Sequence, residues 1–417
     1  MSRLRKPVIF ETAFGLYTVD ELIGEGGAGR VLGGVGPDDT KVALKVLAEE
    51  RASTEKRRRF KNEIAFLSRN RHPNIVPVID HGVSRGHEIT GPFYVMQRYG
   101  GSLRDVMQAG LAPDRVLPLF SQILDGVEAA HLQQVVHRDL KPENILYDRG
   151  SDRLAIADFG IAQFSEDLIV TLVETAPSQR LANFQYAAPE QRVKGQKVAQ
   201  EADIYALGLI LNEMFTGTVP HGTQYRLIEN IDKRFAFLDP LVASMLAQSP
   251  SGRPSTIGDV KGLIQRYQAE AVSLQRISKI DGAVIKASEI DDPSAQDPPR
   301  LVHADWDRGR LTLTLDRPVS AQWIEALNNL MGSYRSVVGK PPASFSFQGN
   351  QASVGAMEHE VQAVIDHFKD WLPKATQALK HRLESEARRQ EAQLRERLRR
   401  EREEEEKRLR VLRNIRI

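Results

Sequence analysis

The most constraining feature of this chain is one run of eight residues, His137–Asn144, which reads His-Arg-Asp-Leu-Lys-Pro-Glu-Asn. An apolar pair follows it, and Asp158-Phe159-Gly160 comes after a short gap. Two acids and an amide therefore lie on short loops between apolar segments. A rigid scaffold can hold side chains in such positions while a substrate can still reach them.

The side chains of this run suit chemistry on a phosphate group. Asp139 can accept a proton from an attacking hydroxyl. Asn144 and Asp158 offer the hard oxygen ligands that Mg²⁺ takes beside phosphate oxygens. Lys141 can neutralise negative charge on a phosphoryl group during its transfer.

A glycine-rich segment lies inside an expected meander of antiparallel strands over residues 16–46, which alternate apolar and polar in short pieces. The segment reads Gly-Glu-Gly-Gly-Ala-Gly-Arg-Val over Gly24–Val31. A dinucleotide-binding loop would open a helix directly, whereas strand and turn residues follow here. The pattern therefore predicts a hairpin whose backbone N–H groups can approach phosphates closely.

The complete set of motifs resembles the eukaryotic-type (Hanks-type) serine/threonine protein kinase family over about residues 14–268. After the glycine hairpin comes Val42-Ala43-Leu44-Lys45, and the catalytic run and Asp-Phe-Gly follow in the family's order. Later matches are Ala188-Pro189-Glu190, the helix opening at Asp203, and Ser251-Gly252-Arg253-Pro254. The resemblance implies an α+β fold with two lobes: an antiparallel sheet with one helix, then a mainly helical lobe.

The resemblance also implies a site for ATP and Mg²⁺. Lys45 would hold the α- and β-phosphates and pair with Glu63, while Asp139 and Lys141 would act in catalysis. Asn144 and Asp158 would hold the metal. The residues expected to contact ATP are Gly24, Glu25, Gly26, Gly27, Ala28, Gly29, Val31, Ala43, Lys45, Met96 and Leu146. Of these, Val31, Ala43 and Leu146 would enclose adenine, and Met96 would lie at the back of its pocket.

Other residues take structural roles in this resemblance. Asp203 would brace the catalytic loop, and Arg253 would pair with Glu190. His137 and Phe159 are interpreted as packing residues beside Leu67 and Val78.

Substrate preference and regulation follow from three further positions. Lys141 favours serine or threonine substrates over tyrosine, because tyrosine-directed relatives differ there. Asn183 stands where relatives usually have threonine, which leaves the preference just after the phosphoacceptor open. Arg138 precedes the catalytic Asp139, and we expect a phosphorylated Thr175 or Ser178 to pair with it. The alternative is that Glu174 takes this place in a constitutively active enzyme.

A competing interpretation is a non-catalytic scaffold with the shape of a kinase. Degraded scaffolds usually lose the lysine, the catalytic aspartate or the metal-binding aspartate, and all three are present here. Nucleotide hydrolysis on another fold is disfavoured, because the chain has no G-x-x-x-x-G-K-[ST] run.

Composition bounds the remaining questions. A chain of 417 residues predicts two or three folded units, and the absence of cysteine excludes disulfides and thiolate metal sites. A net charge of +2 gives no general attraction to nucleic acid or membrane. No apolar run approaches the ~20 residues that span a bilayer. We expect a cytoplasmic protein that acts on protein substrates, with neither nucleic acid nor membrane as a partner.

The rest of the chain predicts a linker over residues 269–300, a small α+β module over 301–357 and a long charged helix over 358–417. Within the module we expect a strand at Arg310–Leu315, a helix at Ala321–Tyr334, a strand at Ala343–Phe347 and a helix from about Val354. Glutamate and arginine pairs four residues apart favour a solvated single helix in the tail. Leu394, Leu398, Leu409 and Leu412 form a broken apolar seam that leaves a homodimeric coiled coil open.

Overall fold

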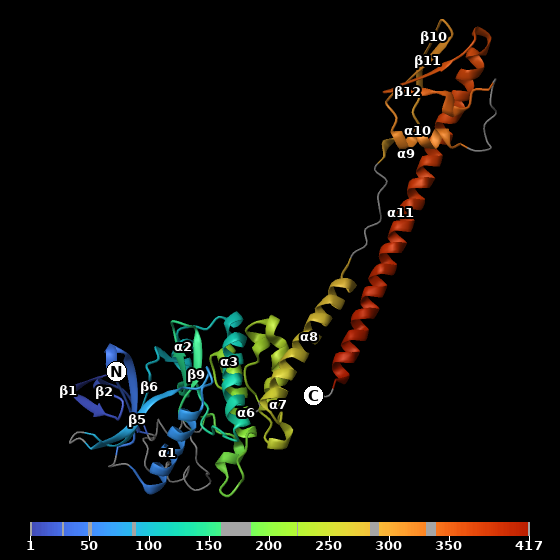
Figure 1. Cartoon of the computed structure of the whole chain (residues 1–417). Coiled ribbons are helices and arrows are strands. Elements are labelled where there is room, and N and C mark those ends of the chain that lie inside the picture. The colour runs from blue at the N-terminus through green and yellow to red at the C-terminus, as the bar shows by residue number, and fades with distance from the viewer. Residues whose placement is uncertain are drawn as a thin grey trace. The chain divides into compact units, whose positions relative to one another are not determined.

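The computed structural model describes residues 2–26, 29–48, 52–85, 89–159, 185–222, 224–283, 292–330 and 339–415. The chain divides into two compact units. The first comprises Met1–Val272 together with Asn414–Ile417, and the second comprises Ser273–Arg413. Figure 1 shows the elements of both units, coloured from the N-terminus to the C-terminus.

The N-terminal lobe is a six-stranded antiparallel sheet with the strand order β1-β2-β3-β4-β6-β5 and the helix α1. The meander predicted from the alternating pattern is confirmed by the antiparallel pairing of three consecutive strands. The elements of this lobe are β1 (Ser2–Glu11), β2 (Leu16–Gly26), β3 (Gly29–Val35), β4 (Lys41–Val46), α1 (Thr54–Arg69), β5 (Val78–Arg85) and β6 (Thr90–Gln97).

Residues 72–76 form a turn with one isolated bridge, and β5 begins only at Val78. One feature of this lobe differs from the sequence interpretation. The strand β1 lies before the predicted start of the domain. Phe10 of β1 is fully buried and meets Phe93 edge to face at 4.9 Å, which anchors the added strand to the sheet.

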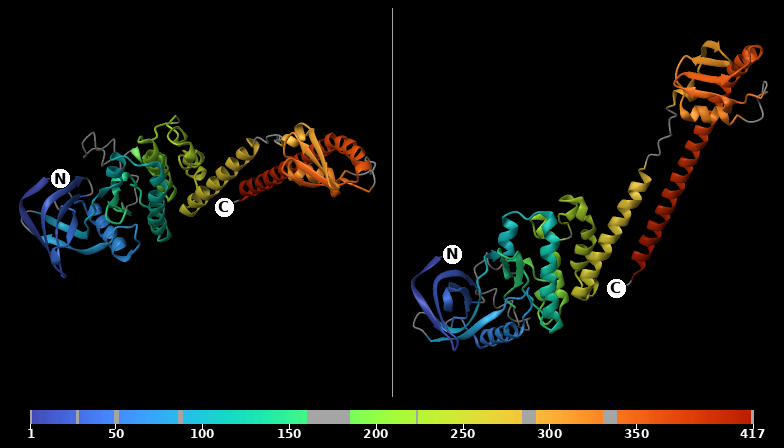
Figure 2. Two further views of the ribbon diagram at one scale, coloured as in Figure 1. Left: turned by 90° about the horizontal axis from the view of Figure 1, so that it is seen from above. Right: turned by 45° about the horizontal axis from the view of Figure 1, so that its top comes forward.

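The C-terminal lobe is mainly helical and is built around α6 (Glu201–Thr216). Almost all of this helix is buried, including its polar residues Asp203, Asn212 and Glu213. The helix predicted to open at Asp203 is confirmed as α6. Around α6 lie α2 (Leu103–Gln108), α3 (Pro113–Leu132), α7 (Asp239–Met245), α8 (Ile257–Asp281) and a small sheet of β7 (Gly101–Ser102), β8 (Ile145–Asp148) and β9 (Arg153–Ile156). The two-lobed α+β architecture is thus present (Figure 2).

The second unit contains a four-stranded antiparallel sheet with the order β10-β11-β13-β12. Buried residues of the sheet, of α10 and of the first half of α11 form one apolar cluster. The elements are α9 (Pro293–Gln296), β10 (Leu301–Asp307), β11 (Arg310–Leu315), α10 (Ala321–Asn328), β12 (Ser346–Gln348), β13 (Gln351–Gly355) and α11 (Val361–Asn414). The predicted strand Arg310–Leu315 is confirmed as β11.

Several boundaries expected in this region are wrong. Val354 lies in β13 and not in a helix, because Ala352 and Val354 alternate into the core while β13 pairs with β11. The predicted linker is partly helical, since α8 continues to Asp281 and α9 also lies in it. The expected separation at residue 357 is wrong as well, because the first half of α11 packs in the same core as the sheet.

Two shorter differences concern the ends of elements. The helix expected over 321–334 ends at Asn328, and the strand expected over 343–347 is a helical turn followed by β12. Within the described part of the chain, no helix is both long and apolar enough to cross a bilayer.

Candidate active site

The centre of the site is a buried lysine held between two carboxylates. Lys45 of β4 lies with its Nζ 2.8 Å from Glu63 Oε1 of α1 and 2.8 Å from Asp158 Oδ1, just after β9. Burial alone would lower the pKa of Lys45, but the charges of Asp158 and Glu63 hold this pKa well above its ordinary value. The ammonium therefore stays charged, and the predicted pairing of Lys45 with Glu63 is present.

The pKa values of the two carboxylates, Glu63 and Asp158, shift in opposite directions. Burial raises the pKa of Glu63 more than Lys45 lowers it. Burial also acts to raise the pKa of Asp158, but the charge and hydrogen bond of Lys45 outweigh it and hold that pKa below its usual value. Asp158 thus presents a carboxylate beside the lysine, while its backbone has a φ of 56° in the left-handed region.

Tyr94 of β6 is a further residue of this centre that the sequence interpretation did not include. Its hydroxyl donates to Glu63 Oε1 at 3.0 Å, and its ring lies 5.8 Å from Lys45 Nζ. Phe60 of α1 lies 5.9 Å from the same ammonium. The pairing of β4 with β6 brings Tyr94 opposite Lys45, and α1 and β5 separate these two strands in the sequence.

The catalytic run forms a loop in which Asp139 is held from two sides. Asn144 Nδ2 donates to the backbone oxygen of Asp139 at 2.8 Å and to its Oδ2 at 3.1 Å. Lys141 Nζ lies 3.1 Å from the same Oδ2. The Asp139 side chain is 45% exposed, so its carboxylate is both oriented and accessible. These three predicted residues are brought together.

Asp203 of α6 fixes the backbone of this loop, as expected. Its carboxylate accepts the N–H groups of His137 at 2.8 Å and of Arg138 at 2.7 Å, and it also contacts His131 Nε2 at 2.8 Å. Arg138 has a φ of 69°, which is costly for a residue with a side chain. The two charge-assisted hydrogen bonds that the buried Asp203 carboxylate accepts offset that cost.

His137 and Phe159 are packing residues, as predicted. Their rings lie 4.7 Å apart, and Phe159 lies 4.7 Å from Phe66 of α1. His137 Nε2 also contacts the backbone oxygen of Ala157 at 2.9 Å, which ties the catalytic loop to the segment that carries Asp158.

The glycine hairpin is formed by β2 and β3, with Gly24 opposite Val31 and Gly26 opposite Gly29. A side chain at Gly24 or Gly26 would meet no other part of the described protein, so the backbone there borders open space. At Gly29 a Cβ would clash with the backbone oxygen of Val46, and φ is 130°, so this position requires glycine.

The apolar residues expected around adenine come from four strands of both lobes. Ala43 of β4 is paired with Met96 of β6, and Val31 of β3 is paired with Lys45. Leu146 of β8 comes from the other lobe and packs against the same core cluster. Gly27, Ala28, Asn183, Glu174 and the phosphosite candidates Thr175 and Ser178 lie outside the described residues.

Two ionic networks, one of them fully buried, support the loop and the end of the following segment. Arg253 forms a bidentate pair with Glu190, at 2.7 and 2.9 Å, as expected. A second network was missed, because its members are far apart in sequence and their spacing carries no signal. In it Arg104 of α2 bonds Glu143 of the catalytic loop, Glu213 of α6 and the Tyr186 hydroxyl, at 2.6–2.7 Å.

Comparison with known proteins gives a consistent result. Residues 17–271 match the family model described as protein kinase domain. The chain is 31% identical to the serine/threonine-protein kinase PknD of Mycobacterium tuberculosis (strain ATCC 25618 / H37Rv) over 402 residues, which cover 86% of this chain and 56% of PknD. It is 35% identical to PrkC of Bacillus subtilis (strain 168) over 214 residues, covering 49% of this chain and 31% of PrkC.

The chain thus spans about half the length of PknD and less of PrkC. Among solved structures, the kinase domain of Mycobacterium tuberculosis PknI aligns with a TM-score of 0.47 and 27% identity. That alignment covers 60% of this chain and 96% of the PknI chain.

Proposed function

The chain belongs to the eukaryotic-type serine/threonine protein kinase family, and from this premise we propose that it transfers the γ-phosphoryl group of MgATP to serine and threonine hydroxyls of proteins. The observation that carries the proposal is the contact of Lys45 with both Glu63 and Asp158. This contact joins the sheet, α1 and the metal-binding segment in the arrangement that phosphoryl transfer requires.

The residues present fit a nucleotide and a magnesium ion. Gly24 and Gly26 leave their backbone uncovered, and Lys45 carries a fixed charge beside it. In the described part of the chain no group of three or more His, Asp or Glu is placed to hold a metal. One aspartate and one amide instead suit Mg²⁺, which binds few protein ligands and takes substrate phosphates and water for the rest.

Asp158 and the Oδ1 of Asn144 would hold the metal, because Asn144 Nδ2 is already used as a donor to Asp139. When bound, Mg²⁺ neutralises charge that develops on the phosphate oxygens. Lys45 orients the phosphates, and the hinge after Met96 would border adenine together with Val31, Ala43 and Leu146.

Asp139 would accept the proton of the attacking hydroxyl. Asn144 and Lys141 hold its Oδ2, so the remaining Oδ1 is left to face a substrate hydroxyl. Lys141 also lies where it would offset charge on the phosphoryl group, and this residue supports the assignment to serine and threonine substrates.

We infer that the enzyme phosphorylates its own activation segment at Thr175 or Ser178. Arg138 supports this, because burial lowers the pKa of its guanidinium and a nearby phosphate would favour the charged form. Its Nη2 donates to the backbone oxygen of Val198 at 3.1 Å, so the guanidinium is held against the stretch that follows Glu190.

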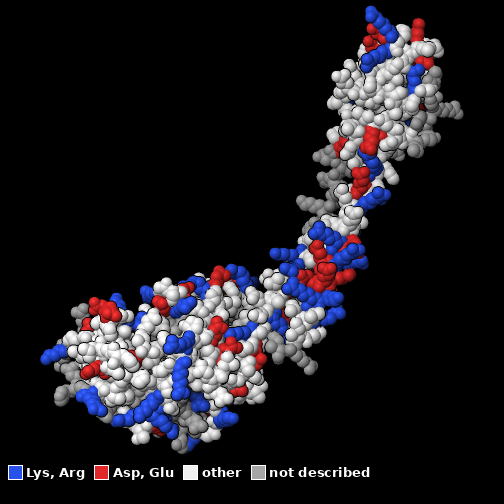
Figure 3. Space-filling view, in the orientation of Figure 1, with Lys and Arg blue, Asp and Glu red and all other residues white. Residues whose placement is uncertain are grey.

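The second unit is proposed as a docking or targeting module. Its long helix α11 carries mixed acidic and basic side chains over its last third, as Figure 3 shows in red and blue. Within this unit Arg276 and Asp281 of α8 pair with Glu405 and Arg402 of α11. These contacts place the end of α8 beside α11 near Leu409, while Leu394 of the apolar seam is 44% exposed.

A phosphorylation assay tests the proposed function. The full chain is incubated with labelled ATP and a general protein substrate, with Mg²⁺ or with excess EDTA. The proposal expects label on serine and threonine, and none on tyrosine, only when Mg²⁺ is present. Release of phosphate from ATP without label on any protein, at equal rates with and without substrate, would instead indicate an ATPase.

A further inference from the structure

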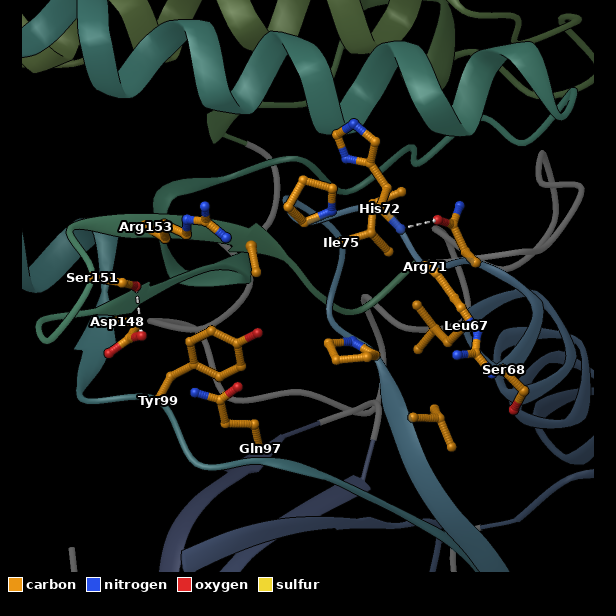
Figure 4. A pocket seen from close by; sticks show the side chains of 15 residues that line it. Leu67, Ser68, Arg71, His72, Ile75, Gln97, Tyr99, Asp148, Ser151 and Arg153 are labelled. Carbon is orange, nitrogen blue, oxygen red and sulfur yellow. Dashed lines mark hydrogen bonds between the residues drawn. The ribbon is translucent and has the colours of Figure 1, made fainter.

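A pocket of about 440 Å³ lies between the two lobes, and the hinge is the one part of its lining that it shares with the proposed ATP site. It is formed by the end of α1 and the following loop, by the hinge after β6, and by the β8–β9 hairpin. Figure 4 shows Arg153, Ser151, Asp148 and Tyr99 on one side of it, and His72 and Arg71 on the other. An apolar floor separates the sides and comprises Leu67, Ile75, Pro77, Val78 and Ala155.

One end of the pocket presents hydrogen-bond donors with defined orientations. Asn70 is 5% exposed, and its Oδ1 accepts the N–H of His72 at 2.9 Å. This bond fixes the amide orientation, so Nδ2 is a donor, and it is buried with no partner among the described residues. His72 Nδ1 accepts the N–H of Asn74 at 3.2 Å, which leaves Nε2 as the ring's donor.

A buried donor without an acceptor is costly, so the Asn70 amide marks a place where an acceptor is missing. Arg71, the next residue, is exposed and forms no ion pair with any described residue. This end of the pocket therefore combines an unused buried donor with an unused positive charge.

The opposite end also presents donors, beside one acid. Asp148 is the one acidic residue of the lining, and it already accepts hydrogen bonds from Ser151 Oγ at 2.7 Å and from Gly150 N–H at 3.0 Å. These hydrogen bonds and the charge of Arg153 lower the pKa of Asp148, while the Arg153 guanidinium has no hydrogen bond to any described residue. The Tyr99 hydroxyl has none either, and burial followed by the charge of Asp148 raises the pKa of Tyr99 to about 12, so this phenol remains a donor.

Charge and shape together define the ligand. Each end of the pocket has hydrogen-bond donors and one arginine, which is Arg71 at one end and Arg153 at the other. The apolar floor lies between the two ends, so a single small anion would satisfy one end only. We propose that this pocket binds an extended acidic peptide segment of a partner protein, with carboxylates at both ends and an apolar side chain on the floor between them.

Binding in this pocket would be linked to nucleotide binding. The pocket takes Leu67 and Val78 from one lobe and Ala155 from the other, with Gln97 and Tyr99 on either side of the hinge residue Arg98. It is formed in the same lobe arrangement in which Lys45 contacts Glu63 and Asp158. A ligand that fills it would favour that arrangement and tighten the binding of ATP, and ATP would tighten the binding of the ligand to the same extent.

The test is fluorescence anisotropy with the full chain and a labelled pentapeptide that carries glutamate on both sides of a central leucine. The probe has no hydroxyl to phosphorylate, so its binding is independent of the proposed kinase activity. The expected result is saturable binding that weakens at least tenfold in the double variant Arg71→Gln/Arg153→Gln. A glutamine version of the probe is expected not to bind.

The matched control is the double variant Arg69→Gln/Arg149→Gln, which removes two neighbouring exposed arginines outside the pocket and leaves the net charge equal to that of the first variant. This control is expected to bind the probe as the unchanged chain does. Equal weakening in both variants would overturn the proposal in favour of general attraction to a basic surface.

One further variant and one competition experiment complete the test. Tyr99→Phe, which removes one donor and keeps the ring, is expected to weaken binding about three- to tenfold. Absence of saturable binding to the unchanged chain would overturn the proposal. Displacement of the probe by equimolar inorganic phosphate would overturn it as well, in favour of a site for phosphate alone.

Discussion

Lys45 Nζ lies 2.8 Å from Glu63 Oε1 and 3.1 Å from Glu63 Oε2, inside the N-terminal lobe, where both side chains are almost completely buried. A buried lysine of this kind remains charged only because carboxylates surround it. The pair therefore couples the position of α1 to the position of the Lys45 ammonium.

Glu63→Gln is expected to lower kcat/KM for ATP by about 10–100-fold, since one charge-assisted hydrogen bond contributes about 1.5–3 kcal/mol. Tyr94→Phe is the graded control, because it removes only the 3.0 Å hydrogen bond to the same carboxylate. Steady-state kinetics with varied ATP measure both. Equal kinetics for Glu63→Gln and the unchanged chain would show that the pair has no role in activity.

The buried pair of Arg253 and Glu190 makes a prediction about stability. Their side chains are 0% and 4% exposed, so Glu190→Gln leaves a buried guanidinium poorly compensated. We expect the free energy of unfolding of the first unit to fall by about 3–5 kcal/mol in a denaturant titration. The exposed pair of Arg115 and Asp152 supplies the control, because Asp152→Asn should change stability very little. A similarly small loss of unfolding free energy in both variants would show that the buried pair of Arg253 and Glu190 does not stabilise the first unit.

The activation segment provides a prediction about regulation. Incubation with MgATP followed by phosphopeptide mapping is expected to show phosphate at Thr175 or Ser178. The double variant Thr175→Ala/Ser178→Ala should lose about tenfold or more of the activity, because a phosphate brings several charge-assisted hydrogen bonds to Arg138. An unmodified segment in a fully active enzyme would favour Glu174 as the constitutive partner.

The charged tail makes a prediction about self-association. Arg276 Nη1 lies 2.7 Å from Glu405 Oε1 within the second unit, and Leu409, one turn further along α11, is 9% exposed. Because α8 covers this part of α11 within the chain, we expect sedimentation of the full chain to give a monomer. A dimer mass that disappears on removal of residues 383–417 would support the coiled coil.

The same contact can be tested by charge exchange. Arg276→Glu should speed amide exchange over 400–413 about two- to fivefold, and adding Glu405→Arg should restore the slower rate. High salt should reduce the difference by screening. No change in exchange in any variant would show that the contact does not form in solution.

The local motifs were predictable because their chemistry is carried by closely spaced residues. Asp139, Lys141 and Asn144 lie within six positions, and the sequence run alone indicated that they act together. Asp203 was predicted through resemblance, and the structure supplies the reason, since it fixes two backbone N–H groups beside a left-handed Arg138.

What could not be predicted depends on pairing between distant segments. Tyr94 reaches Glu63 only through the sheet, and Arg104 meets Glu143, Glu213 and Tyr186 from another helix. Val354 was misassigned because a five-residue strand carries little periodicity of its own, and pairing with β11 decides its state. The strand β1 likewise depends on its partner, through the burial of Phe10.

The most direct test of the central claim is phosphate transfer by Asp139→Asn, compared with the unchanged chain under saturating MgATP. Asn144 and the loop contacts can persist in this variant, so the thermal midpoint should stay nearly the same. Transfer should fall by about 10²–10⁴-fold, because the side chain can no longer accept the proton of the hydroxyl. Full transfer activity in a normally folded Asp139→Asn variant would contradict the account.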